Sequence, residues 1–180
     1  MSARALHPSI WTGEVADLLA HLPAGCHCVE RPRDGAEPVT DHVIVSPAGI
    51  DLVQVRPARG RVGVRTTRDG IDRSMMFVEG VDRTVWLHDL ACTLGEIGDA
   101  LGRTPLSSLR RGWLCLEGAD WFELPAGMRL AGFPVLPPRL LAQFLPHRGA
   151  CSAFHIDAAI ARLQDSFAPT RARADELVSA

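Results

Sequence analysis

The chain has 180 residues, of which 47% are hydrophobic and 22% charged, and its formal net charge is −2. These values are typical of one globular domain with its own core, and they exclude a largely disordered chain. No apolar run approaches the roughly 20 residues of a membrane helix and no secretory signal is recognisable, so we expect a cytoplasmic protein with no membrane partner.

Apolar periodicity and turn residues divide the chain into helices and strands. Leucine and valine recur at helical spacing between Val15 and Leu22, whereas Val- and Ile-rich runs flank the turn at 47–49. In chain order, the predicted elements are a helix at 10–22, strands at 26–30, 41–46, 50–56, 59–66 and 74–79, a helix at 84–101, strands at 112–117 and 133–136, and helices at 137–145 and 156–167. This order predicts a single α/β (α+β) domain over 1–180, with a mixed central β-sheet flanked by helices and a flexible tail at 168–180.

The five cysteines, an odd number, predict free thiols in a reducing compartment. Four of them lie in apolar sequence and are expected to be buried. Cys26-His27-Cys28 contains zinc-binding residue types, but its thiols are one residue apart, whereas zinc sites separate them by two or more. Strand alternation places the two thiols on one face and His27 on the other, so thiols packed in a core are the favoured interpretation and a metal site is the alternative.

All 19 basic residues are arginine, and several of them cluster in one predicted strand. If that strand is extended, Arg59, Arg61 and Arg65 share one face at period two, with Arg68 beyond them. Such a face can bind the phosphates of DNA. A solvated hairpin that its charges keep soluble is an equally open interpretation.

The segment from Asp41 to Arg56 resembles the core of the nuclease-related domain (NERD) family, a branch of the restriction-endonuclease-like PD-(D/E)XK fold. In that family an Asp begins one strand, a hairpin containing Gly follows, and the next strand ends in Glu-x-Lys. Three further pieces occur in the same order. Thr12-Gly13-Glu14 resembles the N-terminal Gly-Glu helix of the family, 114–121 resembles the strand and Ala-Asp-Trp loop of bacterial members, and 133–141 resembles the closing strand and helix. The resemblance covers about residues 10–167 and implies a restriction-endonuclease-like core.

The resemblance implies metal-dependent phosphodiester hydrolysis. Mg²⁺ polarises the phosphate and activates water, carboxylates on adjacent strands hold the ion, and a lysine supports the reaction. On this chain the resemblance places Asp41 as a metal ligand and Glu14 as a further acidic group. The Glu and Lys positions hold Gln54 and Arg56, which supply neither a carboxylate nor a base, because arginine stays protonated. Arg56 can still hold a phosphate through two hydrogen bonds.

Other residues near this motif are weaker candidates. Asp51 lies three residues before Gln54, so strand alternation places it on the opposite face of the sheet. An acidic residue from 117–123 is a second candidate to replace the missing carboxylate, although no pattern supports it. His88 falls near a helix position where the family often carries a Gln, but an ordinary helix histidine is the simpler interpretation.

Three functions remain open from the sequence. The first is a NERD-like domain with impaired or lost nuclease activity that keeps a DNA-binding or accessory role. The second is a weak Mg²⁺- or Mn²⁺-dependent DNA nuclease with Glu14 and Asp41 as metal ligands. The third is an interaction or assembly domain with a protein partner, or with further copies of itself, and no nucleic acid. The net charge of −2 favours this third function over the first.

Overall fold

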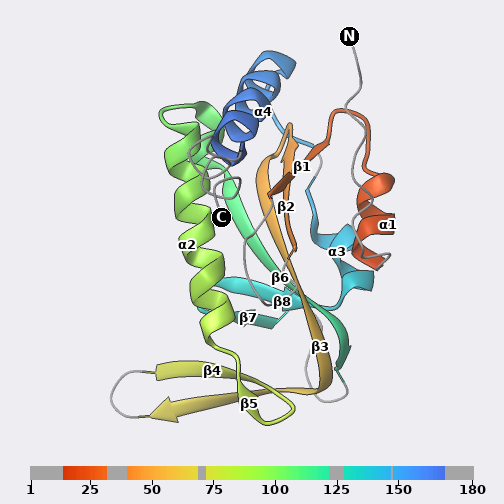
Figure 1. Ribbon diagram of the computed structural model, residues 1–180, viewed down its shortest axis with the longest axis vertical. Helices are drawn as coiled ribbons and strands as arrows, with labels where there is room; N and C mark the ends of the chain where they lie inside the picture. The colour runs from red at the N-terminus through yellow and green to blue at the C-terminus, as the bar shows by residue number, and fades with distance from the viewer. Residues whose placement is uncertain (1–13, 32–39, 69–71, 122–127, 147, 169–180) are drawn as a thin grey trace, which may run out of the picture.

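The computed structural model describes residues 14–31, 40–68, 72–121, 128–146 and 148–168, which are arranged around one eight-stranded mixed sheet (Figure 1). The helices are α1 (Glu14–Ala20), α2 (Val85–Leu101), α3 (Pro138–Phe144) and α4 (Ala153–Phe167), with a 3-10 helix η1 (Pro105–Ser108). The strands are β1 (His27–Arg31), β2 (Thr40–Ser46), β3 (Gly49–Arg68), β4 (Asp72–Val78), β5 (Val81–Asp82), β6 (Arg110–Asp120), β7 (Met128–Leu130) and β8 (Phe133–Leu136).

The strand order is β1-β2-β3-β6-β8-β7, which confirms the predicted mixed sheet. Strand β2 pairs antiparallel with both β1 and β3, whereas β3, β6 and β8 run parallel. The parallel step from β3 to β6 needs a long crossover, and α2 lies within it. The second half of β3 pairs with β4, and β4 with β5, so these strands form an arm at the lower end of Figure 1.

Helices cover both faces of the sheet, with α2 and α4 on one face and α1 and α3 on the other (Figure 1). We call these the α2 face and the α1 face. Along β3, Ile50 and Leu52 belong to the core of the α2 face, and Val53 and Val55 belong to the core of the α1 face. Because both faces are buried, the strands carry nearly continuous apolar runs instead of alternating with polar residues.

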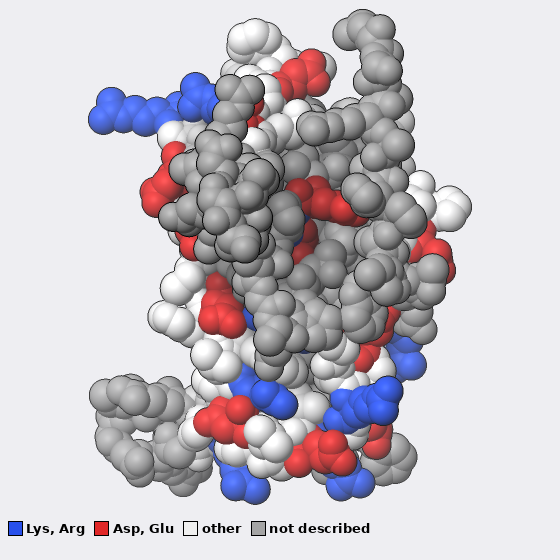
Figure 2. Space-filling view, in the orientation of Figure 1, with Lys and Arg blue, Asp and Glu red and all other residues white. Residues whose placement is uncertain are grey.

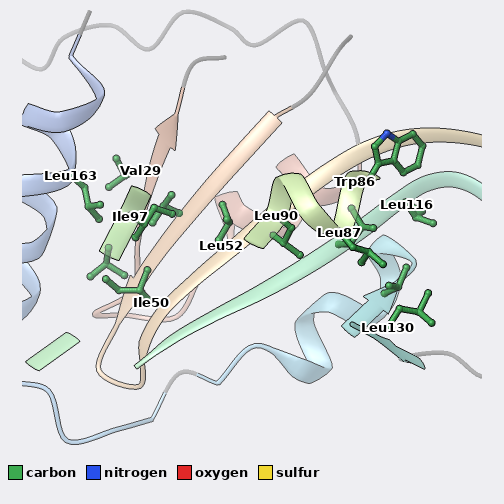
Figure 3. Close-up of a cluster of buried hydrophobic side chains, with 14 of the residues drawn as sticks. Val29, Ile50, Leu52, Trp86, Leu87, Leu90, Ile97, Leu116, Leu130 and Leu163 are labelled. Carbon is green, nitrogen blue, oxygen red and sulfur yellow. The ribbon is translucent and has the colours of Figure 1, made fainter. Parts of the chain in front are cut away.

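The larger core lies between the sheet and α2. Leu87, Leu90 and Ile97 extend from α2 towards the sheet, where Ile50 and Leu52 meet them (Figure 3). These helix residues recur at the spacing that the sequence predicted for a helix over 84–101. The helix ends at Gly102, whose positive φ of 59° lets its N–H bond back to the carbonyls of the last turn.

A tight hairpin turn sets the register of β2 and β3. Ser46 pairs with Gly49, and Gly49 adopts a φ of 130°, which L-residues with side chains rarely take. A Cβ at Gly49 would also lie 2.3 Å from the carbonyl oxygen of Leu109. Glycine at this position therefore lets the turn pack against the segment before β6, and the resulting register places Asp41 opposite Gln54.

The predicted helices and the central hairpin are confirmed, with small shifts of their ends. The two predicted strands at 50–56 and 59–66 are one long strand, β3, with a bulge between Pro57 and Gly60. The short elements β5, β7 and η1 were not predicted. The first turn of the predicted N-terminal helix and the tail after residue 168 lie outside the described residues. None of the helices that the structure describes is both long and apolar enough to cross a membrane.

The prediction that four cysteines are buried is wrong. Of the five free thiols, Cys115 is buried, Cys26 and Cys151 are partly covered, and Cys28 and Cys92 are exposed. Cys28 lies on β1, an edge strand with a neighbour on one side only, and Cys92 lies on the outer side of α2. Within the described ranges, no group of three or more His, Cys, Asp and Glu residues is placed to hold a metal ion.

Candidate functional site

The β2–β3 hairpin brings three of the predicted site residues together. Asp41 lies directly opposite Gln54 in the antiparallel register, and Arg56 follows two residues later on the same face. Asp41 and Gln54 are fully buried, and Arg56 is 2% exposed. These three side chains lie on the α2 face, where residues of α2 bond to Gln54 and Arg56. The positions that the motif predicted therefore meet, but in a buried environment.

An arginine from the neighbouring strand lies beside Asp41. Arg31 ends β1 and pairs in register with Asp41 on β2. Its Nη1 donates to Asp41 Oδ2 at 3.2 Å, and its Nη2 donates to Glu96 on α2. The carboxylate that the motif predicted as a metal ligand thus contacts a guanidinium of the same chain.

Three polar residues of α2 complete the cluster. Asp89, Thr93 and Glu96 occupy one helix face, because they are separated by four and then three residues. Thr93 is 2% exposed, and its hydroxyl donates to the Asp89 carbonyl at 2.9 Å. The same hydroxyl oxygen accepts from Arg31 Nη1 at 3.5 Å. Thr93 therefore connects the helix to the strand residues beneath it.

Gln54 and Arg56 are each bound to α2. Gln54 Nε2 donates to the Thr93 hydroxyl at 3.3 Å, while Gln54 Oε1 is buried and has no hydrogen-bond partner among the described residues. Arg56 Nη2 donates to Asp89 Oδ2 at 3.0 Å, and its guanidinium lies 5.6 Å from the ring centroid of Trp86. The cation–π contact and the ion pair hold this guanidinium inside the protein.

We call these residues the buried polar network: Arg31, Asp41, Gln54, Arg56, Asp89, Thr93 and Glu96. Positive and negative groups alternate in it, so each guanidinium has a carboxylate beside it. Mg²⁺ requires anionic oxygen ligands, usually carboxylates. Here Asp41 already faces a cation and Gln54 is neutral, so the residues present do not fit Mg²⁺. The arrangement can hold the strands and α2 together through charge-assisted hydrogen bonds.

The structure does not bring the helix that Glu14 begins to this cluster. Helix α1 packs on the opposite face of the sheet, where Val15 joins Ile44, Val53 and Val55 in the second core. The side chain of Glu14 lies outside the described part of the chain, but its helix is separated from Asp41 by the sheet itself. The predicted pairing of Glu14 with Asp41 as metal ligands gains no support from this placement.

The other candidates near the motif are placed elsewhere. Asp51 points to the α1 face, as alternation predicted, where Arg111 Nε donates to it at 2.7 Å and Trp113 Nε1 at 2.8 Å. The hydrogen bond with Asp51 raises the pKa of Arg111. His88 is exposed on α2, with its Nε2 3.5 Å from Cys92 Sγ, and it makes no contact with the buried polar network in the described structure.

Sequence reasoning missed four members of the network. Asp89, Thr93 and Glu96 share one helix face, but this spacing is equally typical of a solvated face beside an apolar stripe. Arg31 was assigned to a loop because Pro and Gly follow it closely. No local pattern indicates that its guanidinium reaches Asp41, since that contact depends on the β1–β2 register.

Of the predicted arginine face, Arg65 lies on the arm, and Arg59 and Arg61 lie just before it, where β3 still runs beside β6. Arg59, Arg61 and Arg65 are exposed on extended β3, and we call them the arginine arm; the side chain of Arg68 lies outside the described residues. Acidic residues lie close by, because the Glu79 N–H donates to the Arg61 carbonyl at 2.9 Å. In Figure 2, blue and red side chains alternate over this lower end of the molecule. The arm is thus a surface of mixed charge that carries exposed guanidiniums.

Comparison of this chain with models of known protein families, with curated proteins and with solved structures found no match. What the chain itself establishes is a mixed α/β fold with parallel β3, β6 and β8 flanked by four helices, and a buried polar network between its central hairpin and α2.

Proposed function

We propose that this chain is a NERD-like, nuclease-related domain that does not cleave nucleic acid and acts by binding it. The sequence pieces that resemble the family occur in the family order over about residues 10–167. Two of them correspond to the paired strands of the β2–β3 hairpin and to the β8–α3 segment. The hairpin has the geometry that such a site needs, because it sets Asp41 beside the Gln54 and Arg56 positions.

The contact between Arg31 and Asp41 carries the proposal of inactivity. A guanidinium 3.2 Å from a fully buried carboxylate supplies the positive charge that a divalent ion would otherwise bring. A metal ion bound to Asp41 would have to displace Arg31 or lie directly beside its guanidinium. Two neighbouring cations repel strongly in a buried environment. Gln54 and Arg56 remove the second carboxylate and the lysine in addition.

The arginine arm supports the binding role. Arg59, Arg61 and Arg65 are exposed, and arginine forms paired hydrogen bonds with phosphate oxygens. Nearby carboxylates limit the local positive charge, so the affinity for DNA is expected to be modest and to fall steeply with salt.

The test combines cleavage and binding in the same preparations. Wild type, Asp41→Ala and the double variant Gln54→Glu/Arg56→Lys are incubated with plasmid and with single-stranded DNA, in Mg²⁺ or Mn²⁺ and in a chelator. We expect no metal-dependent cleavage by wild type. Cleavage by wild type that Asp41→Ala abolishes would establish the alternative, a metal-dependent nuclease with an unusual site.

Binding is measured by fluorescence anisotropy with a labelled duplex over a series of salt concentrations. The variant Arg59→Gln/Arg61→Gln/Arg65→Gln is compared with a control, Arg139→Gln, which removes one exposed arginine of α3. We expect weaker binding and a shallower salt dependence in the triple variant alone. If wild type shows no salt-sensitive binding to duplex or single-stranded DNA, the nucleic-acid role is wrong and an interaction domain is the better description.

A further inference from the structure

A separate cavity lies at the start of β6, away from the buried polar network. In the parallel ladder Ile50 pairs with Arg110, and Gln54 pairs with Leu114, so four residues, or roughly 13 Å, separate the two regions along the strands. Strand β8 pairs with β6 at Leu114 and Cys115, beyond this start. A cavity of about 220 Å³ lies there, between α2, the beginning of β6 and the β7–β8 turn.

Three arginines line this cavity, and two of them have no ionic partner among the described residues. Arg111 is neutralised by Asp51, which it holds through two N–H groups. Arg110 donates to the Leu94 carbonyl at 2.6 Å, and Arg129 donates to the Gly132 carbonyl at 2.5 Å. Neutral carbonyls leave the charges of Arg110 and Arg129 uncompensated, and no carboxylate occurs among the described lining residues.

The remaining wall is apolar. Phe133, Leu94 and Trp113 line the cavity together with the main chain at Gly112. A Cβ at Gly112 would lie 2.7 Å from Leu94 Cδ1 and 3.0 Å from Phe133 Cδ1, so a larger residue would displace these two lining side chains. A second hollow of about 320 Å³ adjoins the first, because Leu94 and Arg110 line both.

We propose that this cavity binds a small organic oxyanion, with its phosphate or carboxylate group between Arg110 and Arg129 and its apolar part against Phe133 and Leu94. Pockets for drug-sized ligands span about 300–1,000 Å³, so this smaller cavity suits a smaller molecule. Guanidinium groups bind both phosphate and carboxylate through paired, charge-assisted hydrogen bonds. The inference does not depend on the proposed function, since no residue of the buried polar network or of the arginine arm takes part.

The test is calorimetric titration of the full chain with four probes. Phenyl phosphate and phenylacetate carry both an anion and an apolar ring, inorganic phosphate carries the anion alone, and benzyl alcohol carries the ring alone. We expect saturable one-to-one binding of at least one of the two aromatic anions, weaker binding of inorganic phosphate and none of benzyl alcohol. The aromatic anion that binds more tightly shows whether the cavity prefers phosphate or carboxylate.

Variants assign the binding to the cavity. Arg129→Gln and Arg110→Gln are each expected to weaken binding of the aromatic anion about tenfold, because each removes one charge-assisted hydrogen bond. Gly112→Ala is expected to weaken binding by displacing Leu94 and Phe133 with no change in charge. Arg139→Gln serves as the control on an exposed arginine elsewhere. Arg129 is exposed on the short strand β7, so its variant is expected to fold even if Arg110→Gln, which also loses the contact with α2, does not.

Two results would overturn the proposal. One is the absence of saturable binding of both aromatic anions to wild type. The other is binding that Arg129→Gln, shown to be folded by circular dichroism, leaves unchanged.

Discussion

The β2–β3 hairpin carries one buried aspartate on each face of the sheet, and the two are held in different ways. Asp51, on the α1 face, receives two N–H groups of Arg111 and the indole N–H of Trp113, all from β6, the strand beside it. Asp41, on the α2 face, meets Arg31 from the edge strand β1, which also reaches Thr93 and Glu96 on α2. One carboxylate is bound within the sheet, and the other belongs to a network that joins sheet and helix.

This difference shows that a buried carboxylate at the predicted motif position is not by itself a metal site. Both aspartates are fully buried, and both have an arginine as partner. Burying a charge is strongly unfavourable unless a partner of opposite sign accompanies it. In this chain arginine supplies that partner on both faces, and on the α2 face it does so at the position where the NERD resemblance implied Mg²⁺.

The largest expected effect concerns the ion pair of Asp51 and Arg111 on the α1 face. Arg111→Met would leave the fully buried Asp51 carboxylate without its guanidinium, with the Trp113 N–H still donating to it. Removal of one partner from a buried ion pair costs about 3–5 kcal/mol, so we expect a loss of about 4 kcal/mol in the free energy of unfolding. Urea denaturation measures it, with Arg139→Met as the exposed control. Adding Asp51→Asn should recover part of the loss; a double variant no more stable than Arg111→Met would show that the pair is not the cause.

A titratable group beside Asp41 gives the second prediction. His42 lies on the hairpin next to Asp41 but on the other face, and burial lowers its pKa from 6.5 to about 4. Between these pH values the unfolded chain binds a proton that the folded chain does not, so the free energy of unfolding falls as the pH falls from 6.5 to 4. Because of His42, the free energy of unfolding at pH 4 is about 3 kcal/mol lower than at neutral pH.

The corresponding experiment compares wild type with His42→Gln in urea denaturation at several pH values. Glutamine does not titrate, so its variant should lose less stability than wild type on acidification from pH 7 to pH 4. Parallel pH profiles for the two proteins would contradict a neutral, buried His42.

The third expected loss of stability is smaller and concerns the contact of Arg31 with Asp41 on the α2 face. Arg31→Met removes the guanidinium beside Asp41, but Arg31 is 21% exposed and Asp41 has a further interaction, so the expected loss is about 2 kcal/mol. In the double variant Arg31→Met/Asp41→Asn both charges of this pair are removed, and much of the stability should return. A double-mutant cycle isolates the coupling of the pair, and a coupling near zero would show that the contact does not stabilise the fold.

The sequence predicted the frame of the site but not its partners. Alternation in the second strand placed Gln54 and Arg56 on one face and Asp51 on the other, because strand periodicity is a local property. The resemblance added Asp41 from the strand before the turn. The contact of Thr93 with Gln54 joins residues far apart in the chain, and it depends on how α2 packs on the sheet. The burial of the cysteines was misjudged for a similar reason, since apolar sequence around Cys28 does not reveal that β1 is an edge strand.

The central claim is that Arg31 takes the place of a metal ion beside Asp41. Calorimetric titration of wild type with Mn²⁺, with Asp41→Ala as the matched control, tests it most directly. We expect no saturable binding by wild type and the same small heats from both proteins. Stoichiometric binding of Mn²⁺ to wild type that is lost in Asp41→Ala would contradict the account, because it would show that the carboxylate accepts a metal ion in the presence of Arg31.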